Sequence, residues 1–194
     1  MPKVVDHEQY RKELLGKCFD LFATKGYAAI TMREIAQGLN VSTGTLYHYF
    51  PSKQALFEQL VEEISQQDVS AALAEMGGAK TLEETMKGLG RYLVKNEDYF
   101  IKWTYIWVDF CQHQDLNELR NNAVFKRANR NYQQAVCELL GVQDTALATF
   151  VLSLVNGLIL EKLWCNETID FVKQCTLLGK MITAYLGNKV TALR

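Results

Sequence analysis

Residues 42–50 place hydrogen-bonding side chains at helical spacing. Their sequence is Ser-Thr-Gly-Thr-Leu-Tyr-His-Tyr-Phe, and a helix would turn Leu46 and Phe50, four residues apart, toward the interior. A solvated helix face usually carries charged residues, whereas hydroxyls and polar aromatic tips contact phosphates and base edges, and glycine lets a backbone approach closely. The outward face therefore predicts contact with nucleic acid. Its residues are Thr43, Gly44, Tyr47 and His48.

The charge around this segment favours a polyanionic partner, although the charge of the whole chain does not. The 194 residues include 21 basic and 22 acidic side chains, for a net charge of −1. No acidic residue lies between Glu34 and Glu58, and residues 1–57 hold 7 basic and 5 acidic side chains. Phosphate can therefore approach this stretch without repulsion. The alternative is that Tyr47 and Tyr49 merely pack on neighbouring helices, which leaves the missing carboxylates unexplained.

Other residues that carry chemistry form no recognisable site. The three histidines lie outside nucleophile and metal motifs, and the five cysteines form no C-x-x-C pair. We therefore expect no enzyme activity, no cofactor and no metal. A small all-helical enzyme is a weak alternative. A thiol-based redox regulator is another, but the apolar neighbours of the cysteines favour inert, buried thiols. These residues are His7, His48, His113, Cys18, Cys111, Cys137, Cys165 and Cys175.

The elements that position these side chains are predicted to be helices throughout. Two prolines and the absence of a strand pattern indicate an all-α fold of about nine helices. Thr31 and Glu34 form a capping box, Asn40 tolerates a left-handed turn, and Ser42 caps the next helix. Two short helices joined by such a turn form a helix-turn-helix. The predicted helices are about 7–24, 31–38, 42–50, 52–76, 81–95, 96–110, 116–140, 144–164 and 168–186, the last stopped by Gly187.

Residues 30–36, Ile-Thr-Met-Arg-Glu-Ile-Ala, and residues 41–57 together resemble the DNA-binding domain of the TetR family of bacterial transcriptional regulators. The resemblance covers roughly residues 7–60. It implies an N-terminal DNA-binding domain over 1–51, with the helix-turn-helix at about 31–50, joined to a helical ligand-binding and dimerisation domain over 52–194. One departure is Asn40, where the family most often has glycine; asparagine adopts the same left-handed turn.

The resemblance also assigns DNA contacts to particular positions. The start of the second helix would touch the DNA backbone or a base edge, the third helix would supply further contacts, and Lys53 would hold a phosphate near the start of the fourth. Tyr47 and His48 would reach phosphate, sugar or thymine methyl groups. The full set of candidates is Thr31, Arg33, Ser42, Thr43, Gly44, Thr45, Tyr47, His48, Tyr49 and Lys53.

The implied function is ligand-responsive transcriptional regulation, with a homodimeric repressor on a pseudo-palindromic operator. A small hydrophobic or aromatic effector would tilt the fourth helix and release the DNA. A cytoplasmic location is expected, because the N-terminus has no apolar signal region. The uncharged stretch 145–160 is predicted to be a buried core helix, since it is too short and polar to span a membrane.

The helix rich in aromatic residues suggests where the effector binds. Its side chains are apolar on nearly all sides, which predicts an interior helix. These aromatic residues either line a pocket or form plain core, and both interpretations stay open. Asp109 and His113 lie four residues apart and are predicted to form a partly exposed pair. The candidate pocket residues are Tyr99, Trp103, Trp107, Phe110, His113 and Phe125.

The last two helices are predicted to form the dimer interface. They carry more apolar surface than one side of a helix needs, and a two-fold four-helix interface would bury it. That interface would set the spacing of the two recognition helices. The candidate interface residues are Phe150, Leu154, Leu158, Phe171, Leu178, Met181 and Tyr185.

Overall fold

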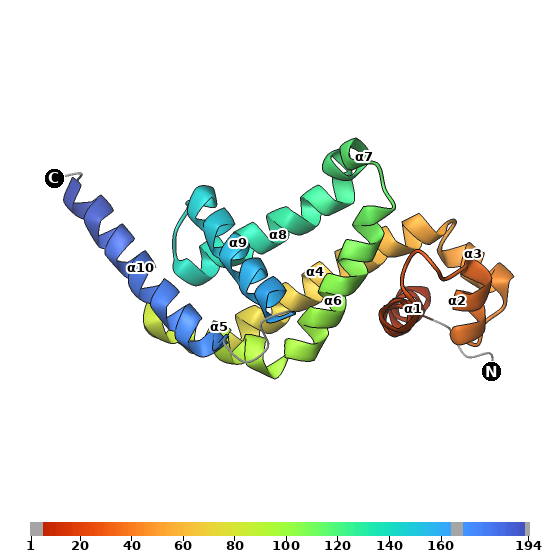
Figure 1. Cartoon of the computed structure of the whole chain (residues 1–194), viewed down its shortest axis with the longest axis horizontal. Helices are drawn as coiled ribbons and strands as arrows, with labels where there is room; N and C mark the ends of the chain where they lie inside the picture. The colour runs from red at the N-terminus through yellow and green to blue at the C-terminus, as the bar shows by residue number, and fades with distance from the viewer. Residues whose placement is uncertain (1–5, 164–168, 193–194) are drawn as a thin grey trace. The chain divides into compact units, whose positions relative to one another are not determined.

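All regular elements that the structure describes are helices, which confirms the all-α prediction (Figure 1). The computed structural model describes residues 6–163 and 169–192. The ten helices of this part of the chain are α1 (His7–Lys25), α2 (Met32–Gly38), α3 (Thr43–Tyr49), α4 (Lys53–Met76), α5 (Leu82–Lys95), α6 (Glu97–Gln112), α7 (Leu116–Asn121), α8 (Ala123–Leu140), α9 (Thr145–Lys162) and α10 (Phe171–Ala192).

The helix predicted over 116–140 is two helices, α7 and α8. Asn122 interrupts it with an extended ψ of 122°. Its side-chain Oδ1 accepts hydrogen bonds from the N–H groups of Val124 (2.9 Å) and Phe125 (3.3 Å), so it caps a new helix. Apolar periodicity continues across the break, which is why the pattern alone did not reveal it.

The chain forms two compact units. The first comprises Met1–Gln67 and Tyr105–Asn129, and the second comprises Asp68–Thr104 and Arg130–Arg194. The first therefore contains the three N-terminal helices, the first part of α4 and the segment around α7. The division at residue 51 into a DNA-binding and a ligand-binding domain is a division by function, and it stays a prediction.

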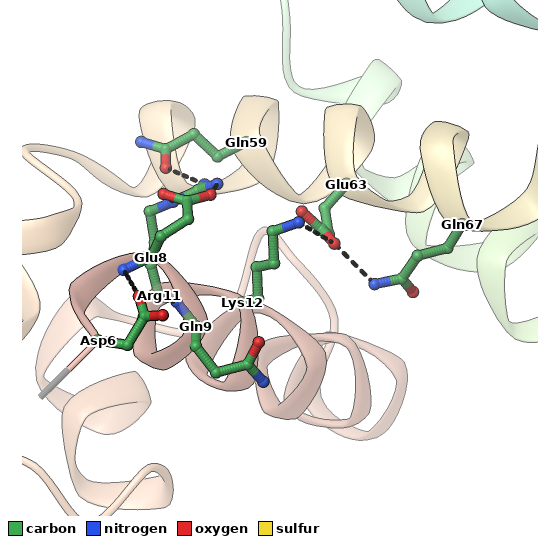
Figure 2. Close-up of polar contacts among 8 residues, drawn as sticks. All are labelled: Asp6, Glu8, Gln9, Arg11, Lys12, Gln59, Glu63 and Gln67. Carbon is green, nitrogen blue, oxygen red and sulfur yellow. Dashed lines mark hydrogen bonds and ion pairs between the residues drawn. The ribbon is translucent and has the colours of Figure 1, made fainter. Parts of the chain in front are cut away.

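In the first unit, polar contacts join α1 to α4 (Figure 2). Arg11 Nη1 donates to Gln59 Oε1 at 2.8 Å, and Lys12 Nζ lies 3.6 Å from Glu63 Oε1. Gln67 Nε2 also donates to Glu63, at 2.9 Å. A cleft of about 150 Å³ lies here, but its polar lining lacks the apolar surface of a typical small-molecule site. It is lined by Glu8, Arg11, Lys12, Gln59, Glu62, Glu63 and Gln66.

The helix-turn-helix forms as the sequence predicts. Thr31 and Glu34 make the reciprocal hydrogen bonds of a capping box at the start of α2. Asn40 has a φ of 55°, which makes the left-handed turn between α2 and α3, and Ser42 caps α3. The inner face of both helices is buried in the first unit. Its side chains are Ile35, Ala36, Leu39, Leu46 and Phe50.

In the second unit, α5 packs closely on α10. A Cβ added to Gly90 would lie 2.7 Å from Val172 Cα, so this glycine lets the two backbones approach. Gly179 plays the same role from the side of α10, where an added Cβ would meet Met86 at 3.1 Å. The core of this unit includes Met86, Leu93, Leu147, Val151, Ile159, Phe171, Cys175, Leu178 and Ile182.

Three predictions about helices in the second unit are corrected. Asn96 lies directly before α6, and its carbonyl accepts a hydrogen bond from the Phe100 N–H at 3.1 Å, but its side chain does not cap α6 and instead donates from Nδ2 to Tyr92 O of α5 at 2.9 Å. Gly187 does not stop α10, which continues to Ala192, because a single glycine costs a helix only about 1 kcal/mol. Trp164 and residue 168, the predicted limits of the last two helices, lie outside the described residues.

The third correction concerns α9. Only 22% of its residues are buried, so it is not the buried core helix that its composition predicted. By length and composition alone, α9 is the one described helix that could cross a membrane. Its buried residues, Leu147, Ala148, Val151 and Ile159, lie on one face that packs into the unit. The exposed side of the helix mixes polar and small residues with two large hydrophobic ones, Phe150 (51% exposed) and Leu160 (38% exposed).

Candidate nucleic-acid interface

The outer face of α3 is exposed as predicted. Thr43, Gly44, Tyr47 and His48 are all exposed, and the Tyr47 side chain retains 53% of its accessible surface. A Cβ added to Gly44 would meet no atom closer than Ser42 Oγ at 3.7 Å. The backbone of α3 is therefore open to a ligand at this point. We call these four residues the α3 surface.

Three of the candidate DNA contacts have structural roles at helix ends. The Thr31 hydroxyl donates to Glu34 Oε2 at 2.7 Å. Ser42 Oγ accepts from the Thr45 N–H at 2.9 Å and lies 2.8 Å from Thr45 Oγ1. These hydrogen bonds fix the residues at which α2 and α3 begin. The three side chains thereby position the exposed residues of the two helices. Direct contacts of Thr31, Ser42 and Thr45 with DNA stay predictions.

The charge at the edge of this surface is mixed. Arg33 is exposed at the start of α2. Glu34 is the nearest carboxylate in sequence, and hydrogen bonds from Thr31 lower its pKa, so it stays ionised. Lys25 Nζ lies 4.0 Å from Glu34 Oε1 and partly offsets that charge. The α3 surface itself has no carboxylate, which keeps it open to phosphate.

Tyr49 packs against α1, in agreement with the alternative interpretation that this tyrosine packs on a neighbouring helix. Its hydroxyl lies 2.8 Å from His7 Nδ1, and its ring lies 5.6 Å from that of Tyr10 and 5.0 Å from that of His48. The side chain is half-buried. It therefore holds the C-terminal end of α3 to α1, and its contribution to DNA binding stays a prediction.

Lys53 is engaged within the protein. Its ammonium donates to the carbonyl oxygens of Tyr27 (2.7 Å), Ala28 (3.2 Å) and Ile30 (2.8 Å). It also lies 4.6 Å from the centre of the Tyr27 ring. A lysine has three N–H groups, so these bonds use them all. Contact with a phosphate, which stays a prediction, would require Lys53 to leave at least one carbonyl.

The same connection between α1 and α2 is held by Asp109, which the sequence showed only as a partner of His113. The Ala28 N–H donates to Asp109 Oδ2 at 2.9 Å, and an added Cβ on Gly26 would lie 3.1 Å from that oxygen. His113 is exposed, with Nδ1 2.8 Å from Asp109 O and 3.7 Å from Oδ1. The partly exposed pair is confirmed, but no sequence signal links Asp109 to a residue 81 positions away.

The six candidate pocket residues do not lie in one unit. Trp107, Phe110, His113 and Phe125 belong to the first unit, and Tyr99 and Trp103 to the second. Phe110 is fully buried and stacks on Phe57 with ring centres 4.0 Å apart. For Phe110 the plain-core interpretation is therefore correct.

The aromatic helix α6 is not interior on nearly all sides. Only Ile106 and Phe110 are buried, whereas Tyr105 and Val108 keep 58% and 41% of their surface exposed. Counting aromatic residues overestimates burial here, because tyrosine and tryptophan have polar atoms that favour partial exposure. Tyr99 donates a hydrogen bond to Asp68 of α4, a half-buried acidic residue that the sequence analysis missed.

The candidate dimer residues separate into buried and exposed sets. Phe171 (2% exposed) and Leu178 (1%) lie in the core of their own unit, so their assignment to an interface is wrong. They share one face of α10 with Cys175 and Ile182. Leu154 and Leu158 are partly buried and pack against that core. The exposed set contains Phe150, Met181 and Tyr185, together with Leu160 and Leu177, which the sequence analysis did not select.

The cysteines offer little support for a redox sensor. Burial raises the pKa of Cys18 to about 12 and that of Cys175 to about 11. Burial also raises the pKa of the half-buried Cys111, and Cys137 is buried. Thiols with such pKa values hold little of the reactive thiolate at neutral pH. Cys165 lies outside the described residues.

Comparisons with known proteins agree with this architecture. Residues 14–60 match the model of the bacterial regulatory proteins of the tetR family. The transcriptional regulator BetI of Rhizobium meliloti is 25% identical over 190 residues, 96% of this chain and 94% of that protein. The repressor KstR of Mycobacterium tuberculosis is 30% identical over 129 residues, 62% of this chain and 59% of KstR. The structure of FadR from Bacillus subtilis in complex with stearoyl-CoA is similar in fold, with a TM-score of 0.63 at 14% identity, over 88% of this chain and 96% of that one.

Proposed function

The chain is a transcriptional regulator of the TetR family, and from this premise we propose that it is a repressor that binds a pseudo-palindromic operator as a homodimer. One observation carries the proposal. The α3 surface is exposed, it has no carboxylate, and the backbone at Gly44, near Tyr47, is open to a ligand. These are the properties that a helix needs to enter a major groove and contact phosphates and base edges.

In the proposed complex, α3 lies in the major groove. Thr43, Tyr47 and His48 contact base edges, sugars or phosphates, and Arg33 reaches the DNA backbone from the start of α2. Thr31, Ser42, Thr45 and Tyr49 keep the two helices in place and take part in contacts at the edge. Lys53 holds the connection between α1 and α2. Its ammonium would contact a phosphate only if the DNA replaced one of the carbonyl oxygens that it binds.

The dimer is proposed to form through the exposed apolar faces of α9 and α10. Phe150, Leu177, Met181 and Tyr185 each keep 45% or more of their surface accessible in the protomer. A second copy would cover both faces in a two-fold interface. It would also set the two α3 helices about 34 Å apart, one turn of DNA, as a palindromic operator requires.

The repressor is proposed to respond to a small hydrophobic or aromatic effector. A protein of similar fold, FadR of Bacillus subtilis, was crystallised in complex with stearoyl-CoA, a ligand with a long apolar chain. Effector binding would shift α4, which begins just after the end of the helix-turn-helix and continues into the second unit, and so change the spacing of the α3 helices. The protein is not an enzyme in this proposal, and it acts in the cytoplasm, where its DNA is.

A mobility shift tests the proposal with DNA from upstream of the protein's own gene. We expect binding that weakens steeply with salt, because phosphate contacts release counterions. Tyr47→Ala should lower affinity about tenfold or more while the melting temperature stays unchanged. Tyr105→Ala is the matched control, since that tyrosine is equally exposed but lies on α6. Salt-independent binding, or equal losses in both variants, would contradict the assignment.

A further inference from the structure

The recognition helix α3 lacks the side chains that bind bases most selectively. Arginine or lysine contacts two acceptors of guanine, asparagine or glutamine pairs with adenine through two hydrogen bonds, and aspartate or glutamate accepts from cytosine. The sequence of α3, Thr-Gly-Thr-Leu-Tyr-His-Tyr over Thr43–Tyr49, contains none of these residue types. No side chain of α3 can therefore select a base through a pair of hydrogen bonds.

Contacts within the protein reduce the polar groups of this helix further. Ser42 Oγ accepts from the Thr45 N–H at 2.9 Å and lies 2.8 Å from Thr45 Oγ1, so the two hydroxyls are used at the helix start. The Tyr49 hydroxyl lies 2.8 Å from His7 Nδ1 of α1. The exposed polar tips that remain for DNA are those of Thr43, Tyr47 and His48. Each of them offers a base single hydrogen bonds only.

Longer polar side chains are exposed on α2 instead. Arg33 lies in its first turn and Gln37 in its last. The first helix of a helix-turn-helix crosses the DNA backbone, whereas the second enters the major groove. Arg33 and Gln37 are therefore placed for phosphates, and base selection is left to α3.

The α3 surface has an open space at Gly44 that is the size of a methyl group. Apart from its chain neighbours, a Cβ added there would meet no atom closer than Ser42 Oγ, at the ordinary contact distance of 3.7 Å. Thr43 and Tyr47 are four residues apart, and Gly44 and Tyr47 are three apart, so all three lie on one face of α3. The Tyr47 side chain is 53% exposed. A ring, a threonine methyl and bare backbone thus lie side by side, and together they form an apolar contact surface.

Thymine is the base whose edge matches such a surface. Its C5-methyl is the one apolar group that the bases present in the major groove, and apolar side chains read it by contact. Burial of that methyl would strengthen binding about fourfold in each half-site. Uracil and cytosine lack the methyl and would leave the space at Gly44 unfilled.

We propose that α3 selects the operator by the methyl group of a thymine in each half-site, which lies over Gly44 between Thr43 and Tyr47. This inference rests on the proposed function, in which α3 lies in the major groove. It adds the base that is read and the way in which it is read. Gly44 and Tyr47 are then residues that determine specificity, through shape rather than through hydrogen bonds.

Four pyrimidines at one operator position test the proposal with the unmodified protein. Each thymine of the operator half-site is first replaced by deoxyuridine, which lacks only the methyl, and mobility shifts identify the position that matters. Replacement there in both half-sites should weaken binding about tenfold. When a C·G pair takes the place of the T·A pair, 5-methylcytosine should bind about tenfold more tightly than cytosine for the same reason. Recognition through hydrogen bonds would make thymine equal to uracil, and 5-methylcytosine equal to cytosine.

Variants of α3 then assign the effect to residues. Gly44→Ala fills the space with its own methyl, so the difference between thymine and uracil should fall below twofold. Tyr47→Phe keeps the ring and should keep the difference, whereas Tyr47→Ala should reduce it. Gly16→Ala, at an equally open glycine of α1, is the control and should leave the difference unchanged. Low salt strengthens binding and keeps the weaker complexes measurable, and circular dichroism establishes that each variant is folded.

The series on the unmodified protein needs no variant, so a folding defect cannot protect the proposal. Unchanged affinity after replacement of every thymine, or an undiminished difference in folded Gly44→Ala, would overturn it. The same gels separate it from the proposed function. Salt-sensitive operator binding without a methyl effect would refute the thymine contact and leave the repressor standing, whereas absence of operator binding would refute the proposed function itself.

Discussion

Single residues of the helix-turn-helix divide into those that shape it and those that it presents. Thr31, Ser42 and Thr45 use their hydroxyls in caps, and Lys53 uses its ammonium on three carbonyls. The side chains of the α3 surface are exposed instead. Substitutions in the two sets should therefore separate DNA affinity from stability.

Gly44 provides the sharpest separation. Gly44→Ala meets no neighbour closer than 3.7 Å and should stabilise α3 by up to about 1 kcal/mol, since alanine is the better helix former. If α3 enters the groove closely, the added methyl should lower operator affinity about tenfold. Melting curves and mobility shifts measure the two effects. Gly16→Ala, an equally open glycine of α1, should gain stability without losing affinity; unchanged affinity in both variants would argue against close approach.

Lys53→Met should lower the stability of the protein, whereas Gly44→Ala should raise it. It keeps the aliphatic stem but removes three hydrogen bonds to carbonyls, which should lower the free energy of unfolding by about 1–3 kcal/mol. Urea unfolding measures this loss. A variant that unfolds like the unmodified protein, yet binds the operator much more weakly, would show that the role of Lys53 is the phosphate contact.

Asp68 predicts a pH dependence of stability. Burial raises its pKa in the folded protein above the ordinary aspartate value of 3.8, so its contribution to stability is fully present below that value and is lost as the pH rises through the folded pKa. Asp68→Asn does not titrate. Its stability relative to the unmodified protein should therefore rise as the pH is raised above about 4, measured by urea unfolding without ligand. The cost of replacing the hydrogen bonds of Asp68 by those of asparagine is the same at every pH compared. A difference in the free energy of unfolding that does not change with pH would therefore contradict the raised pKa of Asp68.

At the scale of elements, contact between helix backbones decides the second unit. Gly90 of α5 faces the backbone of Phe171 and Val172 at the start of α10, where no side chain can yield. Gly88, on the same helix, faces the flexible side chain of Met76 at 3.2 Å. The two glycines look alike in the sequence but have different neighbours.

Gly90→Ala should therefore lower the free energy of unfolding by about 1–3 kcal/mol, because a methyl 2.7 Å from Val172 Cα forces α5 and α10 apart. Gly88→Ala should cost less, since Met76 can move aside. Thermal and urea unfolding of the pair test the packing. Equal effects of the two substitutions would mean that α10 adjusts freely to α5.

At the scale of the whole molecule, the open question is what covers α9 and α10. The proposed answer is a second copy of the chain. Met181→Arg places a charge on that surface, and because Met181 is 52% exposed, the protomer should still fold. Sedimentation should show a monomer, with operator affinity reduced at least tenfold by the loss of the second half-site contact.

Val94→Arg is the matched control, because Val94 has the same 52% exposure but lies on α5. It should leave both the sedimentation coefficient and the operator affinity unchanged. A dimer in Met181→Arg would place the interface elsewhere, and a monomer in both variants would show that added charge, not its position, is responsible.

The sequence by itself determined the elements whose signals are local. The Thr31–Glu34 box, the Asn40 turn and the Ser42 cap involve residues at most three apart, so their hydrogen bonds are readable from residue types. The outward face of α3 follows in the same way from helical periodicity, and residues 30–57 carry the resemblance to the TetR family. Local physics was enough for the helix-turn-helix.

Only the tertiary structure decided which apolar and charged residues meet across the chain. It placed Phe171 and Leu178 in the core rather than on the surface, turned Lys53 toward three carbonyls, and joined Asp109 to Ala28 and Asp68 to Tyr99 and Tyr132. Periodicity shows that a helix has an apolar face. It does not show how much of that face a neighbouring helix covers, or whether a second copy of the chain covers the rest. Those outcomes depend on how helices distant in sequence pack, and residue spacing does not encode that packing.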